Sequence, residues 1–226
     1  MTDTTASSHI LGSGGPKLII VMGVSGCGKS TTGQNVSQAL GGIFVDGDDL
    51  HPAANVAKMS RGEPLTDADR APWLKIIRER ATELATQGNG VTVVACSALR
   101  KAYRELLRGK PVELVKPGSE SQSNVPVAHP KGEVPDVGDD VHIDEHIANT
   151  SPPLKTYFVF IKGTRESLFE RMQKRQGHFM KAGMLDSQLA TLESPEGEDG
   201  VVVVDLEAPP EQQCEQAVAR LKALGS

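Results

Sequence analysis

The sequence predicts an α/β domain with a five-stranded parallel sheet, for two reasons. First, five short apolar runs alternate with segments of helical spacing, as expected for strands that are buried on both faces. Second, a glycine-rich segment separates the first run from a helix. Ligands bind beyond the carboxyl ends of parallel strands, so the segments after these runs are expected to line one crevice. The runs are residues 17–22, 43–45, 91–96, 156–161 and 201–204.

Composition and charge narrow the class of protein. The chain has 226 residues, of which 38% are hydrophobic and 23% charged, and its formal net charge is −5. This balance gives no general attraction to nucleic acid or to an anionic membrane, so we expect neither as a partner. No apolar run approaches the length of a membrane span, and residues 1–16 have neither a basic start nor an apolar segment. We therefore expect a cytoplasmic enzyme with a disordered leader over residues 1–16.

The segment from Gly23 to Ser30 fits the phosphate-binding pattern G-x-x-x-x-G-K-[ST]. Its glycines allow backbone N–H groups to turn toward phosphate oxygens, and the following helix adds the positive end of its dipole. Lys29 can reach the β- and γ-phosphates of a nucleotide, and the Ser30 hydroxyl can bind Mg²⁺. The segment therefore predicts a nucleotide-binding site.

The three cysteines, Cys27, Cys96 and Cys214, lie far apart and lack metal-ligand spacing. This distribution favours a reducing compartment over a disulfide framework. Cys27 lies inside the phosphate-binding segment, either as an oxidation-sensitive thiol or as a small residue at a variable position.

Two acidic residues, Asp46 and Asp48, follow the second apolar run and would both face the crevice if the chain turned at Gly47. In a functional interpretation, Asp48 accepts or orients the proton of a substrate hydroxyl. Asp46 would then hold Mg²⁺, directly or through water. The alternative is two carboxylates in a solvated turn, and the local sequence leaves both open.

Helices are expected between and after the apolar runs. A short helix is expected to open with Pro52, and a longer one to start at Thr66 as its N-cap and to end at the glycines of residues 88–90. Another helix is expected over residues 100–108, and a final one over residues 209–224.

Residues 111–153 differ in composition from the rest of the chain. They hold about half of its prolines, no Phe, Trp or Tyr, and many more acidic than basic side chains. Such a stretch buries too little apolar surface to offset its ordering entropy. We expect a flexible insertion at about 111–153 that interrupts a single domain over residues 17–225. Its histidines are metal ligands in one interpretation and solvated loop residues in the other.

A basic helix is expected over residues 164–176, where Arg171 and Arg175 lie one turn apart and can share a face. Residues 177–180 interrupt this pattern. Asp186 is expected to cap a further helix that runs to about Glu193.

Several motifs together resemble the gluconokinase family. The resemblance covers most of the chain outside the leader and the insertion, and the motifs are jointly specific. It implies a P-loop NTPase fold with three α/β/α layers, similar to nucleoside monophosphate and shikimate kinases, with a mobile lid. The motifs are residues 23–31, Asp46-Gly47-Asp48 with Leu50-His51-Pro52, Asn55 with Lys58-Met59, residues 62–67 with Asp69-Arg70 and Pro72-Trp73-Leu74, residues 96–99 with Tyr103-Arg104, and Gly177-His178-Phe179 with Met184-Leu185.

The resemblance implies an ATP-dependent carbohydrate kinase. Its members transfer the γ-phosphate of ATP to the 6-hydroxyl of D-gluconate, giving 6-phospho-D-gluconate and ADP and feeding the pentose phosphate pathway. ATP, Mg²⁺ and D-gluconate are thus the expected ligands. Dimerisation is common in this family, so a homodimer is the expected assembly.

The resemblance also assigns roles to residues. Asp48 becomes the base or hydroxyl-positioning group, and Asp46 joins Ser30 around the metal. Arg70 becomes the group that binds the gluconate carboxylate, a role suited to a bidentate guanidinium. The expected catalytic residues are Lys29, Asp48, Arg171 and Arg175, the expected ATP-binding residues are Gly23, Val24, Ser25, Gly26, Cys27, Gly28, Lys29, Ser30 and Thr31, and the other expected substrate-binding residues are His51, Lys58, Arg104 and His178.

Other interpretations stay open at this point. Arg70 could be a surface charge paired with Asp67 or Asp69, and the basic helix could be a solvated face. Trp73 is interpreted as a packing residue rather than a sugar platform. The acceptor could be another hydroxy acid, or the loop could serve a nucleotide-gated switch. A guanine-specific switch would usually carry an N-K-x-D motif, which this sequence lacks.

Overall fold

The computed structural model describes residues 15–112, 153–174 and 182–225. These described residues fall within one compact unit. Most of the expected leader and insertion lies outside the described residues, as do Arg175 and His178. The expectations for those segments stay predictions.

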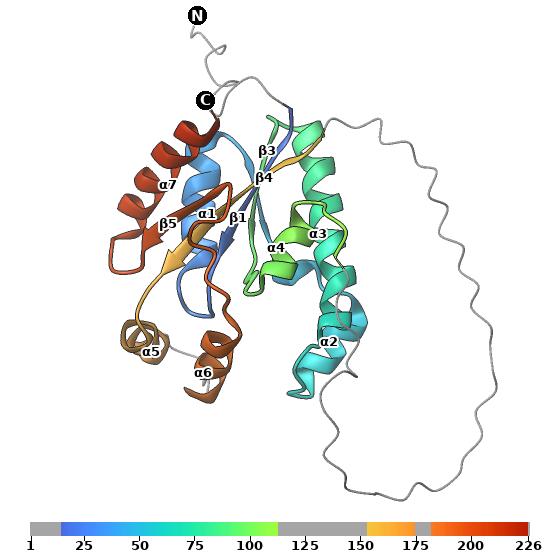
Figure 1. Ribbon diagram of the computed structural model, residues 1–226, viewed down its shortest axis with the longest axis vertical. Coiled ribbons are helices and arrows are strands. Elements are labelled where there is room, and N and C mark those ends of the chain that lie inside the picture. Colours follow the sequence, from blue (N-terminus) through green and yellow to red (C-terminus); the bar gives the residue numbers. More distant parts are fainter. Residues whose placement is uncertain (1–14, 113–152, 175–181, 226) are drawn as a thin grey trace, which may run out of the picture. The chain divides into compact units, whose positions relative to one another are not determined.

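Five parallel strands form one sheet in the order β2-β3-β1-β4-β5 (Figure 1). The central strand β1 (Lys17–Met22) pairs with β3 (Val91–Ala95) and β4 (Lys155–Lys162). The edge strands are β2 (Ile43–Asp46), which pairs with β3, and β5 (Val201–Asp205), which pairs with β4. The predicted five-stranded parallel sheet is confirmed, and each predicted strand lies within one residue of its expected ends.

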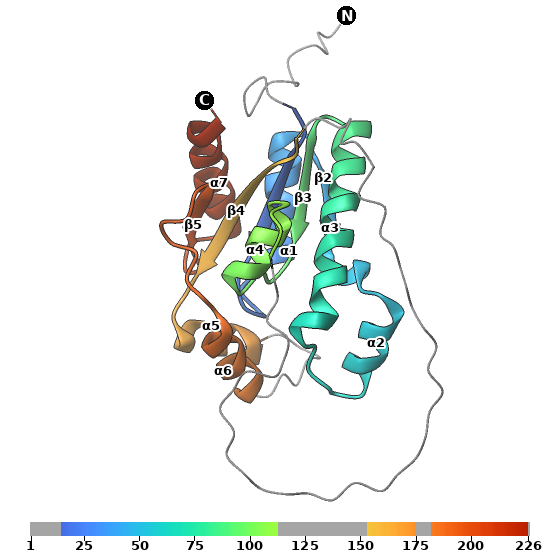
Figure 2. The same ribbon diagram turned by 45° about the vertical axis from the view of Figure 1, so that its right-hand side comes forward.

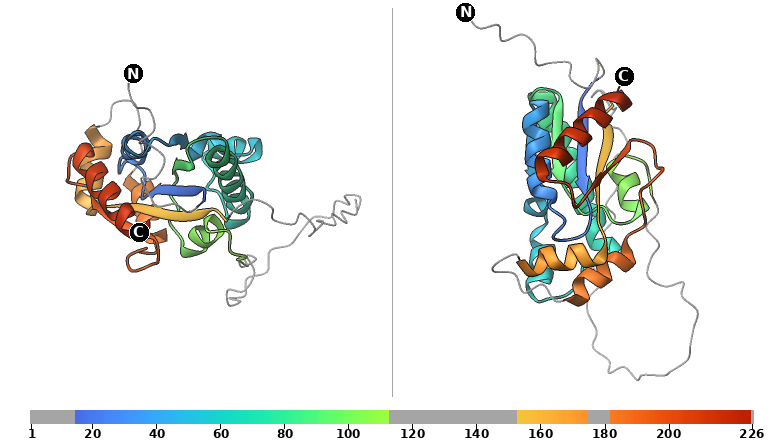
Figure 3. Two further views of the ribbon diagram at one scale, coloured as in Figure 1. Left: turned by 90° about the horizontal axis from the view of Figure 1, so that it is seen from above. Right: turned by 90° about the vertical axis from the view of Figure 1, so that its left-hand side faces the viewer.

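Helices cover both faces of this sheet, because alternate side chains of β1 enter two separate cores. Ile19 and Val21 pack in one core with residues of α1 (Lys29–Leu40) and α7 (Pro210–Gly225). Leu18 and Ile20 pack in the other with residues of α3 (Asp67–Gln87) and α4 (Lys101–Leu107). In the right-hand view of Figure 3 the strands run between α1, in blue, and α4, in green. Burial on both faces explains why the strands read as continuous apolar runs.

The strands point toward the end of the unit where α2 (Ala53–Ser60), α5 (Arg165–Lys174) and α6 (Ala182–Thr191) lie (Figures 1 and 2). This is the end where the sequence analysis expected the crevice. None of the described helices is long and apolar enough to cross a membrane.

The helix boundaries follow local signals in most places. Thr66 caps α3 as predicted: its hydroxyl accepts from the Asp69 N–H, and the Asp69 carboxylate accepts from the Thr66 N–H in a reciprocal capping box. The prediction for Asp186 is wrong, because this residue lies inside α6 and its carboxylate pairs with Arg165 at 2.6 Å. Pro52 precedes α2 as its N-cap instead of occupying its first turn.

Arg104 was expected to bind substrate, and in the structure its guanidinium is engaged by groups of the chain itself. Its side chain is fully buried, and its Nε and Nη2 donate to the Glu198 carboxylate at 3.0 and 2.5 Å. Its Nη1 donates to the backbone oxygens of Ala98 and Leu99, at 3.0 and 3.1 Å. These bonds occupy the guanidinium and hold the loop between β3 and α4, so Arg104 has a structural role.

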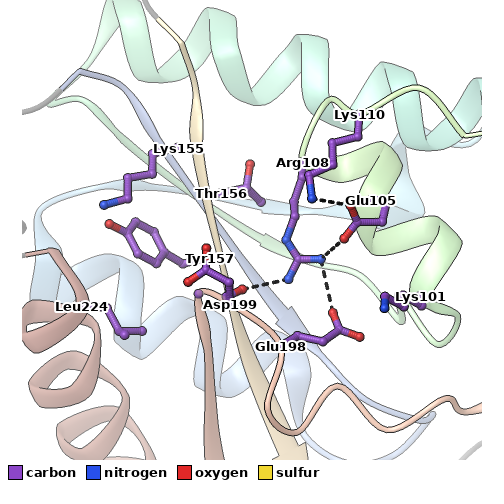
Figure 4. A pocket seen from close by; sticks show the side chains of 11 residues that line it. Lys101, Glu105, Arg108, Lys110, Lys155, Thr156, Tyr157, Glu198, Asp199 and Leu224 are labelled. Carbon is purple, nitrogen blue, oxygen red and sulfur yellow. Dashed lines mark hydrogen bonds and ion pairs between the residues drawn. The ribbon is translucent and has the colours of Figure 1, made fainter.

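Arg108 extends this network beside a pocket of about 560 Å³ near the amino end of β4 (Figure 4). Its Nη1 lies 2.7 Å from Glu105 and 3.2 Å from Glu198, and its Nη2 donates to the Asp199 carbonyl. Burial alone would raise the pKa of Glu198, but the hydrogen bonds from Arg104 and Arg108 lower it below its ordinary value. Glu198 is therefore ionised at neutral pH, and it joins α4 to the segment before β5.

Replacing Glu198 with Ala is expected to lower the free energy of unfolding by about 3–5 kcal/mol, because it leaves the buried Arg104 guanidinium without its counter-ion. Urea denaturation of the purified variant measures this change. The matched control is Glu83→Ala on the exposed face of α3, where the carboxylate pairs with Arg80. That variant should change stability by less than about 0.5 kcal/mol. Equal losses in the two variants would contradict the structural role of Glu198.

Candidate active site

The phosphate-binding loop connects β1 to α1, as the sequence predicted. Gly28 precedes α1 with a φ of +101°, and an added Cβ there would meet no atom within 4 Å. Gly26 has a φ of +80°, and an added Cβ would lie 2.6 Å from Cγ of Met172. Gly28 therefore faces open space at the start of a helix, which suits an anion, while Gly26 allows α5 to pack against the loop.

Lys29 and Ser30 lie in the first turn of α1, and Ser30 contacts the last residue of β2. Lys29 Nζ donates to the Val24 carbonyl at 3.1 Å. The Ser30 hydroxyl donates to Oδ2 of Asp46 at 2.9 Å. A hydroxyl beside a carboxylate is a donor set that suits Mg²⁺, which commonly uses one or two carboxylates together with phosphate oxygens. The two residues predicted to hold the metal thus lie in contact.

Asp46 also positions the turn that carries Asp48. Its Oδ1 accepts from the Asp48 N–H at 3.2 Å and caps the short 3₁₀ helix η1 (Gly47–Leu50). Trp73 Nε1 on α3 donates to the Gly47 carbonyl at 2.8 Å and fixes this turn from the other side. The Asp48 side chain is 85% exposed, so it is accessible to a substrate. Trp73 itself is buried, in agreement with its interpretation as a packing residue.

His51 lies between this turn and α3. Its ring stacks on Trp73 with centroids 4.0 Å apart, and its Nε2 lies 3.9 Å from Oδ1 of Asp48. Burial lowers the pKa of His51; the Arg70 charge lowers it further, while the Asp48 charge opposes the shift. The ring is therefore neutral at pH 7.

Arg70 on α3 has a buried Nε that makes no hydrogen bond within the described part of the chain. Its guanidinium carbon lies 5.8 Å from the centroid of the Tyr103 ring. The two acids once considered as its partners are engaged elsewhere. Asp67 accepts from Tyr103 and, at 2.6 Å, from Arg100, while Asp69 accepts from Lys58 at 2.6 Å.

Lys58, a predicted substrate ligand, is thus held by Asp69. The hydrogen bond from Lys58 is the largest of several contacts that lower the pKa of the Asp69 carboxyl. Both side chains are about three-quarters buried. The pair joins α2 to the first turn of α3, and the Asp69 carboxylate holds the Lys58 ammonium there.

Cys96, at the carboxyl end of β3, is influenced by the charges of three predicted site residues. Burial raises the pKa of the Cys96 thiol, the first residue after β3, to about 12, and the charges of Asp48, Lys29 and Arg70 all act on it. The Cys96 thiol is therefore influenced by Lys29, at the end of the phosphate loop, and by Asp48 and Arg70, the two residues predicted to contact the acceptor.

Two helices, α5 and α6, contact the phosphate loop or its surroundings. Arg171 on α5 donates through Nη2 to the Leu206 carbonyl after β5, and its charge also acts on Cys27. Gln188 on α6 accepts through Oε1 from the Ser25 N–H at 2.6 Å. The sequence analysis missed Gln188, since no motif marks it and its partner is 163 positions away.

The structure favours the simpler interpretation of Cys27. Its side chain is fully buried, and burial raises the pKa of its thiol. A buried, protonated thiol is a poor nucleophile, so Cys27 fills space beneath the loop. Cys96 and Cys214 are likewise free and buried.

Comparisons with known proteins agree with this geometry. A family model described as "AAA domain" matches residues 18–116. The gluconokinase of Gluconobacter oxydans is 38% identical over 208 residues, which cover 92% of this chain and 93% of that protein. The thermosensitive gluconokinase of Escherichia coli is 35% identical over 207 residues, covering 90% of this chain and 88% of that one.

Among solved structures, a gluconokinase from Sinorhizobium meliloti aligns with a TM-score of 0.67 and 37% identity, covering 94% of this chain and 95% of that one. The matches extend over most of the length of each of these relatives. The chain belongs to the gluconokinase family.

Proposed function

We propose that this protein is a gluconokinase, which transfers the γ-phosphate of ATP to the 6-hydroxyl of D-gluconate and releases 6-phospho-D-gluconate and ADP. Family membership supports the reaction. The observation that carries the substrate assignment is the buried Nε of Arg70, which has no hydrogen bond within the described residues; the charges of Arg70, Lys29 and Asp48 all act on the buried Cys96 thiol. An unpaired buried donor is costly, so it calls for an acceptor such as the carboxylate of gluconate.

The donor half of the reaction depends on the phosphate loop. Its backbone N–H groups and Lys29 bind the phosphates of ATP and hold the γ-phosphate in line with the acceptor. Ser30 and Asp46 would hold Mg²⁺, since their hydroxyl and carboxylate oxygens already lie 2.9 Å apart. When bound, Mg²⁺ supplies positive charge to the phosphate oxygens.

The acceptor half depends on two groups at opposite ends of the substrate. Asp48 accepts the proton of the 6-hydroxyl as that oxygen forms its bond to the γ-phosphorus, and the bond from the γ-phosphorus to the bridging oxygen of ADP breaks. Arg70 binds the carboxylate of gluconate at the far end. Two-point attachment keeps the 6-hydroxyl in line and favours a hydroxy acid over a neutral sugar.

The roles of Arg171, Arg175, His178 and Gln188 are also proposals. Arg171 lies close enough for its charge to act on the loop residue Cys27, so it is suited to neutralise charge on the transferring phosphate. Gln188 joins α6 to the loop through Ser25. Arg175 and His178 are proposed to act on the phosphates and the substrate, respectively, on the family resemblance alone.

We further propose a cytoplasmic location, a homodimeric assembly and a product that feeds the pentose phosphate pathway. The three free cysteines suit a reducing compartment. The other two proposals rest on the family.

An acceptor panel should distinguish the proposed function from its competitors. Coupled assays of ADP release with gluconate, shikimate, other sugar acids and no acceptor are expected to show the highest kcat/KM with gluconate and little release without an acceptor. Faster turnover of another hydroxy acid would move the assignment to that substrate. Equal ADP release with and without gluconate would favour a nucleotide-gated switch.

Asp48→Asn is expected to lower kcat by about 100- to 10,000-fold, the usual contribution of a general base, because the amide cannot accept the hydroxyl proton. The KM for ATP should change little, since Asp48 is exposed on the acceptor side. Steady-state kinetics with both substrates measures this split. Asp49→Asn, in the same short helix η1 and also exposed, is the matched control. Near-normal turnover by the Asp48 variant would remove it from catalysis.

Arg70→Ala is expected to raise the KM for gluconate by about 10- to 100-fold. This factor corresponds to the free energy of losing charge-assisted hydrogen bonds to a carboxylate. The KM for ATP should stay close to that of the wild type. Arg61→Ala removes an exposed arginine that pairs with Glu63 and serves as the control. An unchanged KM for gluconate in the Arg70 variant would show that Arg70 does not bind the carboxylate.

A further inference from the structure

Asn55 on α2 is a buried polar residue that none of the roles above includes. Asn55 is only 5% exposed. Its Nδ2 lies 2.9 Å from the Asp69 carbonyl oxygen and 3.4 Å from Nδ1 of His51. Asn55 therefore joins the first turn of α3 to the histidine beside Asp48. Buried amides are usually fixed by such bonds, so its orientation can be worked out from its partners.

The Asp69 carbonyl determines which end of the amide faces these partners. A carbonyl oxygen only accepts hydrogen bonds, so the Asn55 atom that faces it must be the donor Nδ2. Nδ2 carries two hydrogens, and the second one faces His51 Nδ1. Nδ1 is then the acceptor, which places the single proton of the neutral imidazole on Nε2.

The Nε2–H group of His51 faces the carboxylate of Asp48. The stack on Trp73 fixes the plane of the ring, and Nε2 lies 3.9 Å from Oδ1 of Asp48. This distance exceeds a hydrogen bond, but the Asp48 side chain is 85% exposed and can rotate toward the ring. Catalytic hydrogen bonds are often long without substrate and shorten in the complex.

We propose that Asn55 is a positioning residue that fixes the Nε2–H tautomer of His51, and that His51 in turn orients the Asp48 carboxylate toward the accepting hydroxyl. The proposal rests on the assigned role of Asp48 in the kinase reaction. In the substrate complex, Asp48 rotates so that Oδ1 accepts from the His51 Nε2–H and Oδ2 accepts from the substrate hydroxyl. In the other tautomer, a lone pair of Nε2 would face the carboxylate and repel it. The neutral state that the proposal requires agrees with the lowered pKa of His51.

The test combines ¹⁵N NMR of the His51 ring with kinetics. In the wild type, Nδ1 should give a pyridine-like signal and Nε2 a pyrrole-like signal, assigned by their loss in His51→Gln. In Asn55→Asp, a carboxylate replaces the donor, so His51 Nδ1 should become protonated. The kcat should then fall by roughly 10- to 100-fold, the size of effect seen when partners that orient metal-ligating histidines are replaced, with the KM for ATP unchanged.

Asn89→Asp is the matched control, because Nδ2 of Asn89 also donates to a backbone carbonyl, that of Gly41, far from Asp48. It should leave both the ring signals and kcat unchanged. If Asn55→Asp fails to fold, Asn55→Ala replaces it, and the ring should then show a mixture of tautomers.

Three results would overturn the proposal: a wild-type His51 protonated on Nδ1, ring signals that the Asn55 variants leave unchanged, or an altered tautomer with normal kcat. The NMR measurement needs no substrate, so it is independent of the gluconate assignment. If the acceptor panel fails for gluconate, kcat is measured with whichever acceptor is turned over. A failure of the proposed function and a failure of this inference are thus distinguishable.

Discussion

The Asp46 carboxylate joins the phosphate loop to the turn that carries Asp48. One of its oxygens accepts from Ser30 in the phosphate loop, and the other accepts from the backbone of Asp48. In the sheet, β3 lies between β2, which ends at Asp46, and β1, which precedes the loop. The hydrogen bond from Ser30 to Asp46 therefore connects segments that follow two non-adjacent strands. This arrangement requires a parallel sheet, because only then do all carboxyl ends meet at one edge. The donor and acceptor halves are therefore built on one rigid support.

Among the described residues, the acids near Arg70 are paired with other groups, and the Nε of Arg70 has no hydrogen bond. Asp67 is engaged by Tyr103 and Arg100, and Asp69 by Lys58 and the start of its own helix. The Nε of Arg70 lies among these groups without a hydrogen bond in the described residues. The fold thus tolerates an unsatisfied buried donor at the place where an anionic substrate is expected, as functional sites often do.

Arg70 and Arg104 show why residue type alone does not identify a substrate ligand. Both arginines belong to motifs of the family resemblance. Arg70 follows the acidic residues Asp67 and Asp69, and Arg104 follows the segment after the third apolar run. Arg104 is fully buried with Glu198 as counter-ion and two backbone acceptors, whereas Arg70 keeps an unpaired donor. The difference arises from Glu198, 94 positions away from Arg104, which no local pattern connects to it.

The sequence by itself determined what depends on neighbouring residues: the phosphate loop between strand and helix, the five apolar strands, the Thr66 cap, and Asp46 and Asp48 at and just after the end of the second strand. These features follow from periodicity, capping and backbone freedom, which act over a few positions. Only the tertiary structure decided the strand order, the burial of Arg104, the pairing of Asp186 with Arg165, and the contacts of Gln188 and Asn55. Each of these depends on which distant segments pack together, and side-chain hydrogen bonds across such contacts leave no periodic trace in the chain.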